Sequence, residues 1–142
     1  MTGAHRKFVH NLDRIVDLTQ AAGVRLILIT QPSLWDGDLS PSELDLLWTG
    51  GLRPPPAPGE SFYSAAALAK GMGAYNRLLL QVCDRRGIEC IDAAEQLPTR
   101  SEIFYDDVHL TEEGSRRLAR LVAGALLEGN APEQRGAGRR IP

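Results

Sequence analysis

The sequence predicts an α/β fold built around a short parallel sheet. Residues 24–30 form a nearly continuous apolar run rich in β-branched side chains, as expected for a strand buried on both faces. A helical stretch ending at Gly23 precedes this run, and a longer one ending at Gly87 precedes a second strand at 88–92. Helix, glycine turn and buried strand together make half of a βαβ unit, which indicates a sheet covered by helices.

Three amphipathic helices are expected, and each has one apolar face. The first begins near His5, and its face consists of Phe8, Leu12, Ile15, Val16 and Thr19. The second covers about 64–86, with Leu68, Met72, Tyr75, Leu79, Val82 and Cys83 on its buried face. The third follows Thr111, a plausible cap, and its inward face consists of Leu118, Leu121, Val122, Ala125 and Leu126.

Composition points to one globular domain. The chain has 142 residues, of which 43% are hydrophobic and 24% charged, so a disordered or fibrous class is excluded. We expect a domain at 1–129 and a disordered tail at 130–142, which is rich in Gly, Pro and Arg. The net charge of −2 gives no electrostatic reason to expect a nucleic acid or an anionic membrane as partner.

The two cysteines and the amino terminus bear on the cellular compartment. Cys83 on a helix and Cys90 on the next strand make no disulfide framework, and we expect both to be buried thiols. The first residues lack the apolar core of a signal peptide, and no apolar run has the length of a membrane span. As written, the chain is expected to be cytoplasmic. If it is a fragment, its start says nothing about the location of the parent protein.

A carboxylate stands three residues before a histidine in the stretch 104–114, on an expected loop before the last helix. This spacing lets Asp106 reach the imidazole N–H of His109, which would fix the tautomer and leave the other ring nitrogen as an acceptor. Such a pair is the base and orienter of a nucleophile–base–acid triad. The alternative is an exposed turn whose acidic residues begin a helix, with a surface histidine beside them.

This block resembles the closing block of the SGNH (GDSL-type) hydrolases. The resemblance rests on Asp106-x-x-His109, the following Leu110-Thr111, and Gly114 in the first helical turn. In that family, the aspartate and histidine of a Ser-His-Asp triad occupy these positions. The order of elements is similar over about residues 5–127. The resemblance therefore implies a partial flavodoxin-like, three-layer α/β/α fold and hydrolysis of a small-molecule ester through an acyl-enzyme, without a cofactor or metal.

The family's other motifs are absent from the sequence. It contains no Gly-Asp-Ser, which carries the nucleophile, and no Gly-x-Asn-Asp, which contributes to the oxyanion hole. The run 37–40 is a near anagram of the first motif but has leucine after Gly-Asp, and Ser33 lacks a strained turn. The chain thus resembles the C-terminal portion of such a hydrolase, with His109 and Asp106 but without their nucleophile. We expect it to be inactive alone.

A long connection from Gln31 to about Ser61 leaves the carboxyl end of the first strand, where α/β sheets gather ligands. Long connections of this kind are often lids or binding loops. Trp35 and Trp48 both lie on it, and they either line an acyl or alcohol pocket or pin the loop to the domain; pinning is favoured. Asp107 is a competitor for the orienting role, but it is expected to face solvent or to hold the loop.

Two further functions remain open. The chain could be a non-catalytic binding or scaffold domain that acts through a homodimer or a partner chain, including a missing N-terminal half, because a small sheet leaves an edge unpaired. It could also hold a metal with side chains drawn from His5, His10, His109, Asp106 and Asp107. The metal site ranks last, because the helical spacing of His5 and His10 does not place them on one face.

Overall fold

The sheet of this chain is parallel and short. The computed structural model describes residues 2–36, 38–49, 63–128 and 140–141. Its strands have the order β1-β2-β3, and they are β1 (Ile27–Ile29), β2 (Glu89–Ile91) and β3 (Arg140–Ile141). Both neighbouring pairs are parallel, with Leu28 opposite Cys90 in the first pair. The parallel sheet predicted from the buried strands is thus present.

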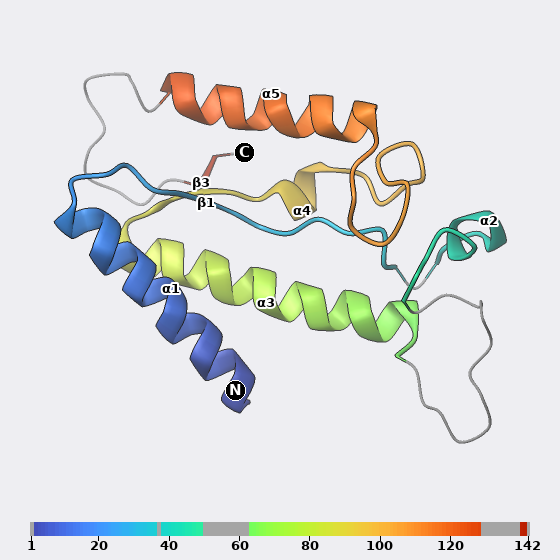
Figure 1. Cartoon of the computed structure of the whole chain (residues 1–142), viewed down its shortest axis with the longest axis horizontal. Coiled ribbons are helices and arrows are strands. Elements are labelled where there is room, and N and C mark those ends of the chain that lie inside the picture. Colours follow the sequence, from blue (N-terminus) through green and yellow to red (C-terminus); the bar gives the residue numbers. More distant parts are fainter. Residues whose placement is uncertain (1, 37, 50–62, 129–139, 142) are drawn as a thin grey trace.

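Helices cover both faces of this sheet (Figure 1). Helix α5 (Glu112–Glu128) lies over one face, and α1 (Gly3–Ala21) and α3 (Ala65–Arg86) lie over the other. Two short helices, α2 (Pro41–Leu44) and α4 (Ala93–Gln96), belong to the connections that follow β1 and β2. The architecture is therefore the expected three-layer α/β/α arrangement with a short parallel sheet, a partial flavodoxin-like or SGNH-like fold.

The helix ends follow the local sequence. Thr2 caps α1 in a reciprocal capping box with His5, and the Ser64 hydroxyl accepts a hydrogen bond from the Ala67 N–H at the start of α3. Gly23 and Gly87 have φ angles of +66° and +63°, a left-handed conformation that favours glycine. Both glycines turn the chain from a helix into a strand, as the sequence predicts.

The buried side chains of the described residues form three clusters. One lies between α1, α3 and the sheet and contains Leu12, Val16, Leu79, Val82, Cys83, Ile88 and Cys90. A second lies between the sheet and α5 and contains Ile91, Ala93 and Ala125. The third lies beyond the carboxyl ends of the strands and contains Leu34, Leu47, Ala65, Leu97, Ile103 and Phe104. This third cluster supports the segment that carries Asp106 and His109.

Burial of the first strand on both faces was predicted wrongly. Ile29 is 38% exposed and Val24, just before β1, is 58% exposed. Among the described strands only β2 pairs with β1, so β1 is an edge strand and its side chains are less covered than those of a central strand. Leu126, expected on the inward face of α5, is also exposed.

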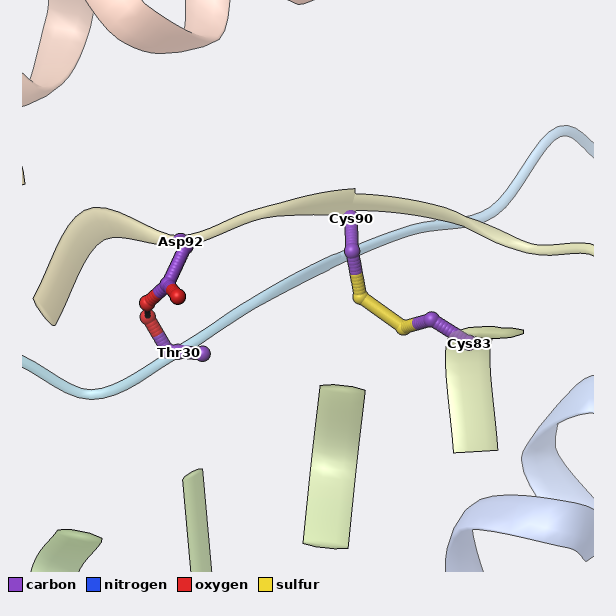
Figure 2. The surroundings of a disulfide bond; sticks show 4 residues. All are labelled: Thr30, Cys83, Cys90 and Asp92. Atoms are coloured by element: carbon purple, nitrogen blue, oxygen red, sulfur yellow. Dashed lines mark hydrogen bonds between the residues drawn. A yellow bond between two sulfur atoms is a disulfide. The ribbon is translucent and has the colours of Figure 1, made fainter. Parts of the chain in front are cut away.

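The two cysteines are paired, which corrects the expectation of free thiols. Cys83 at the end of α3 and Cys90 on β2 form a disulfide, with their Cα atoms 6.2 Å apart (Figure 2). Both were expected to be buried, and both are 2% exposed. The left-handed turn at Gly87 brings the end of the helix back against the strand. Because structural disulfides are rare in the cytoplasm, the pairing does not favour the cytoplasmic expectation, which stays a prediction.

The described residues contain no helix that is long and apolar enough to span a membrane. At the carboxyl terminus, Arg140–Ile141 pairs with β2, where the sequence predicts a disordered tail. The rest of the predicted tail and the glycine- and proline-rich run 50–59 lie outside the described residues.

Candidate active site

The carboxyl ends of β1 and β2 are joined by side chains. Thr30, which follows β1 and is 1% exposed, donates a hydrogen bond from Oγ1 to Oδ1 of Asp92 at 2.9 Å (Figure 2). The same hydroxyl accepts from the backbone N–H of Ala94 at 2.9 Å. A threonine thus links the end of one strand to the start of α4 after the next strand. These bonds hold together the carboxyl ends of β1 and β2, where the connections to the following helices begin.

Asn76 on α3 holds the chain as it leaves this edge. Its Oδ1 accepts from the backbone N–H of Gln31 at 2.9 Å, and its Nδ2 donates to the Gln31 carbonyl at 2.9 Å. One side-chain amide therefore satisfies both backbone groups of a residue beyond the strand. This gives Asn76 a structural role.

The segment that carries Asp106 and His109 is closed by backbone hydrogen bonds. Phe104 and Leu110 form an antiparallel bridge, and the N–H of Tyr105 donates to the carbonyl of His109 at 3.1 Å. Ile103 and Phe104 at its base are fully buried. The loop from 105 to 109 therefore projects from a rigid, buried base at the end of the sheet.

Helix α5 begins directly after this loop, and its first turn is fixed to the same base. Thr111 donates from Oγ1 to the Glu102 carbonyl at 2.6 Å and accepts from the N–H of Gly114 at 3.1 Å. A Cβ atom on Gly114 would clash with the carbonyl oxygen of Ile103, which explains the glycine at this position. The Leu-Thr and Gly of the block thus dock the helix against the loop.

Asp106 is buried, and both of its carboxylate oxygens accept hydrogen bonds. Its Oδ2 lies 2.8 Å from Nδ1 of His109, the contact predicted from the spacing. Its Oδ1 accepts from the backbone N–H groups of His109 at 2.8 Å and Val108 at 3.0 Å. Burial raises the pKa of this carboxyl, but the backbone and imidazole N–H donors outweigh burial and hold the pKa below its ordinary value of 3.8. The group is a carboxylate at neutral pH.

The His109 side chain is 57% exposed, in contrast to its partner. With Nδ1 donating to Asp106, the imidazole presents Nε2 as an acceptor. The ring of Tyr105 stacks on it at 5.7 Å with 12° between the planes, and Trp48 lies 6.3 Å away at 59°. Within the described parts of the chain, the imidazole is hydrogen-bonded to Asp106 alone. This arrangement can accept and return a proton.

Asp107 contacts the loop that carries the tryptophans. Its carboxylate accepts from Nε1 of Trp35 and from the backbone N–H of Trp48, each at 2.7 Å. Trp35 is half-buried, whereas Trp48 is 77% exposed. The first tryptophan therefore pins the loop, and the second stands beside His109. For both residues the sequence offered pinning of the loop or lining of an acyl or alcohol pocket, and it favoured pinning. It did not single out Tyr105, although its position in the block was a usable signal.

The described residues contain no group of three or more His, Cys, Asp or Glu side chains arranged to hold a metal. His5 takes part in the capping box of α1 and contacts the ring of Tyr75. It thus has a structural role at the start of the chain.

An α/β sheet with a carboxylate-oriented histidine beyond its strand ends is typical of hydrolases that use acid–base catalysis. The model of the GDSL-like lipase/acylhydrolase family matches residues 2–117, most of the chain, so the chain belongs to this family. No curated protein and no solved structure matches the chain.

Proposed function

We propose that His109 and Asp106 are the base and the orienting acid of a serine esterase site, and that this chain carries them without a nucleophile. The observation that supports this most directly is the 2.8 Å contact between Nδ1 of His109 and Oδ2 of the buried Asp106. Membership of the GDSL-like lipase/acylhydrolase family supports an ester as the substrate class.

In this mechanism, Nε2 of His109 takes the proton of a serine hydroxyl while the serine oxygen attacks the ester carbonyl. The imidazolium then gives that proton to the leaving alcohol, and an acyl-enzyme remains. Water then attacks the acyl-enzyme, with His109 taking its proton and returning it to the serine oxygen, and the carboxylic acid is released. Asp106 holds the ring in the tautomer with the proton on Nδ1 and stabilises the imidazolium, since its depressed pKa keeps it ionised.

Inactivity of the chain alone follows from the surroundings of His109. No described serine hydroxyl is hydrogen-bonded to its imidazole, and the sequence has no Gly-Asp-Ser. Ser33 lies on the connection after β1 with no hydrogen bond to His109 among the described residues, and Ser40 caps α2 instead. Oxyanion-hole donors typically contribute about 3 kcal/mol each to transition-state stabilisation, so their absence would lower turnover further.

Labelling of the purified chain with a fluorophosphonate probe, read by intact mass and peptide mapping, tests this proposal. We expect no adduct on the folded chain. An adduct that disappears in His109→Ala would mean that a serine of this chain is activated, which overturns the inactivity but supports the role of His109. An adduct that persists in His109→Ala would overturn the role of His109 as the base.

A second candidate function is a non-catalytic binding or scaffold domain. It is favoured by the edge position of β1. Among the described strands, β2 is the only one that pairs with β1, and Ile29 and Val24 are exposed there. An exposed strand edge is a template for pairing with another chain. The partner would be a second copy or a chain that contributes further strands.

Light scattering coupled to size exclusion, with wild type and Ile29→Lys compared, tests this second function. A dimer that the lysine variant converts to a monomer would support pairing at the β1 edge. A monomer at all concentrations for the wild type would leave no role for a homodimer.

A further inference from the structure

Asp107 is 6% exposed, and its carboxylate accepts four hydrogen bonds from one loop. Oδ1 accepts from Nε1 of Trp35 at 2.7 Å and from the N–H and hydroxyl of Thr49 at 3.0 and 2.8 Å. Oδ2 accepts from the N–H of Trp48 at 2.7 Å. A buried carboxylate is costly unless donors surround it, and here the described donors are neutral groups of the connection after β1.

Adjacent carboxylates therefore have divided roles in this block. Asp106 binds the imidazole of His109, and Asp107 binds the connection, so the loop and the imidazole are both fixed to the same short segment. The carbonyl of Asp107 adds a further bond, accepting from the N–H of Leu34 at 2.8 Å. Asp107 thus sets the distance between the connection and the histidine.

The position of Trp48 is the main consequence. Its side chain is 77% exposed, yet its ring lies 6.3 Å from that of His109. Its backbone N–H is the only described donor to Oδ2 of Asp107. An exposed indole held beside an imidazole, with the exposed ring of Tyr105 stacked on the same imidazole, leaves apolar surface free at the point where His109 would act.

We propose that Asp107 is a positioning residue that holds Trp48 against His109, so that the indole forms part of the surface that a substrate meets. The part of this proposal that concerns a substrate rests on the proposed esterase function. The part that concerns the positioning of Trp48 beside His109 by Asp107 does not. A purely structural role is the competing explanation, because Leu34 and Leu47 already anchor the connection in the buried cluster with Phe104.

The substitution Asp107→Asn, which places one amide where the carboxylate stood, separates these explanations. If the single oxygen of this amide takes the place of Oδ1, it can accept from donors on Trp35 and Thr49, but the amide nitrogen then faces the N–H of Trp48, another donor. Asp107→Asn should therefore release Trp48 while leaving most of the anchoring in place. Thr49→Val is the matched control, because it removes only the hydroxyl bond to Oδ1.

The readout is ¹⁹F NMR of protein labelled with 5-fluorotryptophan, whose two resonances are assigned with Trp35→Phe. In the wild type and in Thr49→Val, the Trp48 resonance should shift as His109 is protonated, and His109→Ala should abolish the shift. Asp107→Asn should lose most of the shift while its circular dichroism stays that of the wild type. A shift of wild-type size in folded Asp107→Asn would overturn the proposal.

If Asp107→Asn does not fold, two measurements on the wild type test the proposal. The N–H of Trp48 should be protected from hydrogen exchange, and nuclear Overhauser contacts should join the Trp48 indole to the His109 ring. Rapid exchange together with the absence of these contacts would overturn the proposal. These readouts need no turnover, so they stand whether or not the chain is an esterase. If an ester is hydrolysed by a completed site, Asp107→Asn should raise KM more than it lowers kcat.

Discussion

His109 and Asp106 are joined by two hydrogen bonds at once. Nδ1 of the imidazole lies 2.8 Å from Oδ2 of Asp106, and the backbone N–H of His109 donates to Oδ1 at 2.8 Å. Both bonds lie within one closed loop whose base, at Ile103 and Phe104, is buried. The orientation of the imidazole therefore depends mainly on local structure and should survive changes elsewhere in the chain.

The contribution of Asp106 to stability should depend on pH. Its folded pKa lies below 3.8, so its stabilising effect is full above about pH 4 and is lost as the pH falls through the folded pKa. Urea unfolding of wild type and Asp106→Asn should show a difference in free energy that is largest near neutral pH and shrinks in acid. A difference that stays constant down to about pH 3 would contradict this prediction.

Gly114→Ala should destabilise the protein by about 1–3 kcal/mol, because the new methyl group would clash with the carbonyl of Ile103. Gly124→Ala is the control on the same helix. It meets open space and should instead stabilise by about 0.5–1 kcal/mol, since alanine favours a helix interior. Thermal and urea unfolding of both variants measure whether the two changes in stability have these opposite signs. Equal effects of the two substitutions would mean that helix α5 does not dock as described.

Asn76→Asp should be more harmful than Asn76→Ala. The aspartate keeps an acceptor for the N–H of Gln31 but places a second oxygen against the Gln31 carbonyl, whereas alanine only removes both bonds. We expect a loss of about 1–3 kcal/mol for alanine and more for aspartate at neutral pH. Urea unfolding measures both. An aspartate variant as stable as wild type would show that Asn76 does not clamp Gln31.

Reduction of the disulfide between Cys83 and Cys90 should lower the stability by about 2 kcal/mol, because the loop that it closes is short, with a sequence separation of 7. Thermal unfolding with and without a reductant measures this loss, and the Cys83→Ser/Cys90→Ser double variant is the control that should not respond. Thiol titration of the unreduced, denatured protein should find no free cysteine. Two free thiols in that titration would show that the pair is not oxidised.

Much of this structure could be predicted because its determinants are local. Helix ends depend on neighbouring residues. The capping role expected from the residue type is found at two N-termini, Thr2 and Ser64, and the left-handed turn expected of glycine is found at Gly23 and Gly87. The contact between Asp106 and His109 was also predictable, since three residues separate them in one turn. Their proposed roles came from the block in which they stand.

The remaining features depend on contacts that are distant in sequence. Asp107 meets Trp35 and Thr49 across 72 and 58 positions, and no local pattern indicates which donors will surround a given carboxylate. Burial was overestimated for Ile29, because an apolar run does not indicate whether its strand lies at the edge of the sheet. The disulfide was missed because two cysteines alone do not indicate a pair.

The central claim is that Asp106 holds His109 with the proton on Nδ1 and leaves Nε2 as the acceptor. Long-range ¹H–¹⁵N correlation of the neutral His109 ring measures this tautomer directly in the wild-type chain. We predict a protonated Nδ1 and an unprotonated Nε2, with the preference reduced in Asp106→Asn. A ring with its proton on Nε2, or an equal mixture unaffected by the substitution, would contradict the assignment of Asp106 as the orienting acid.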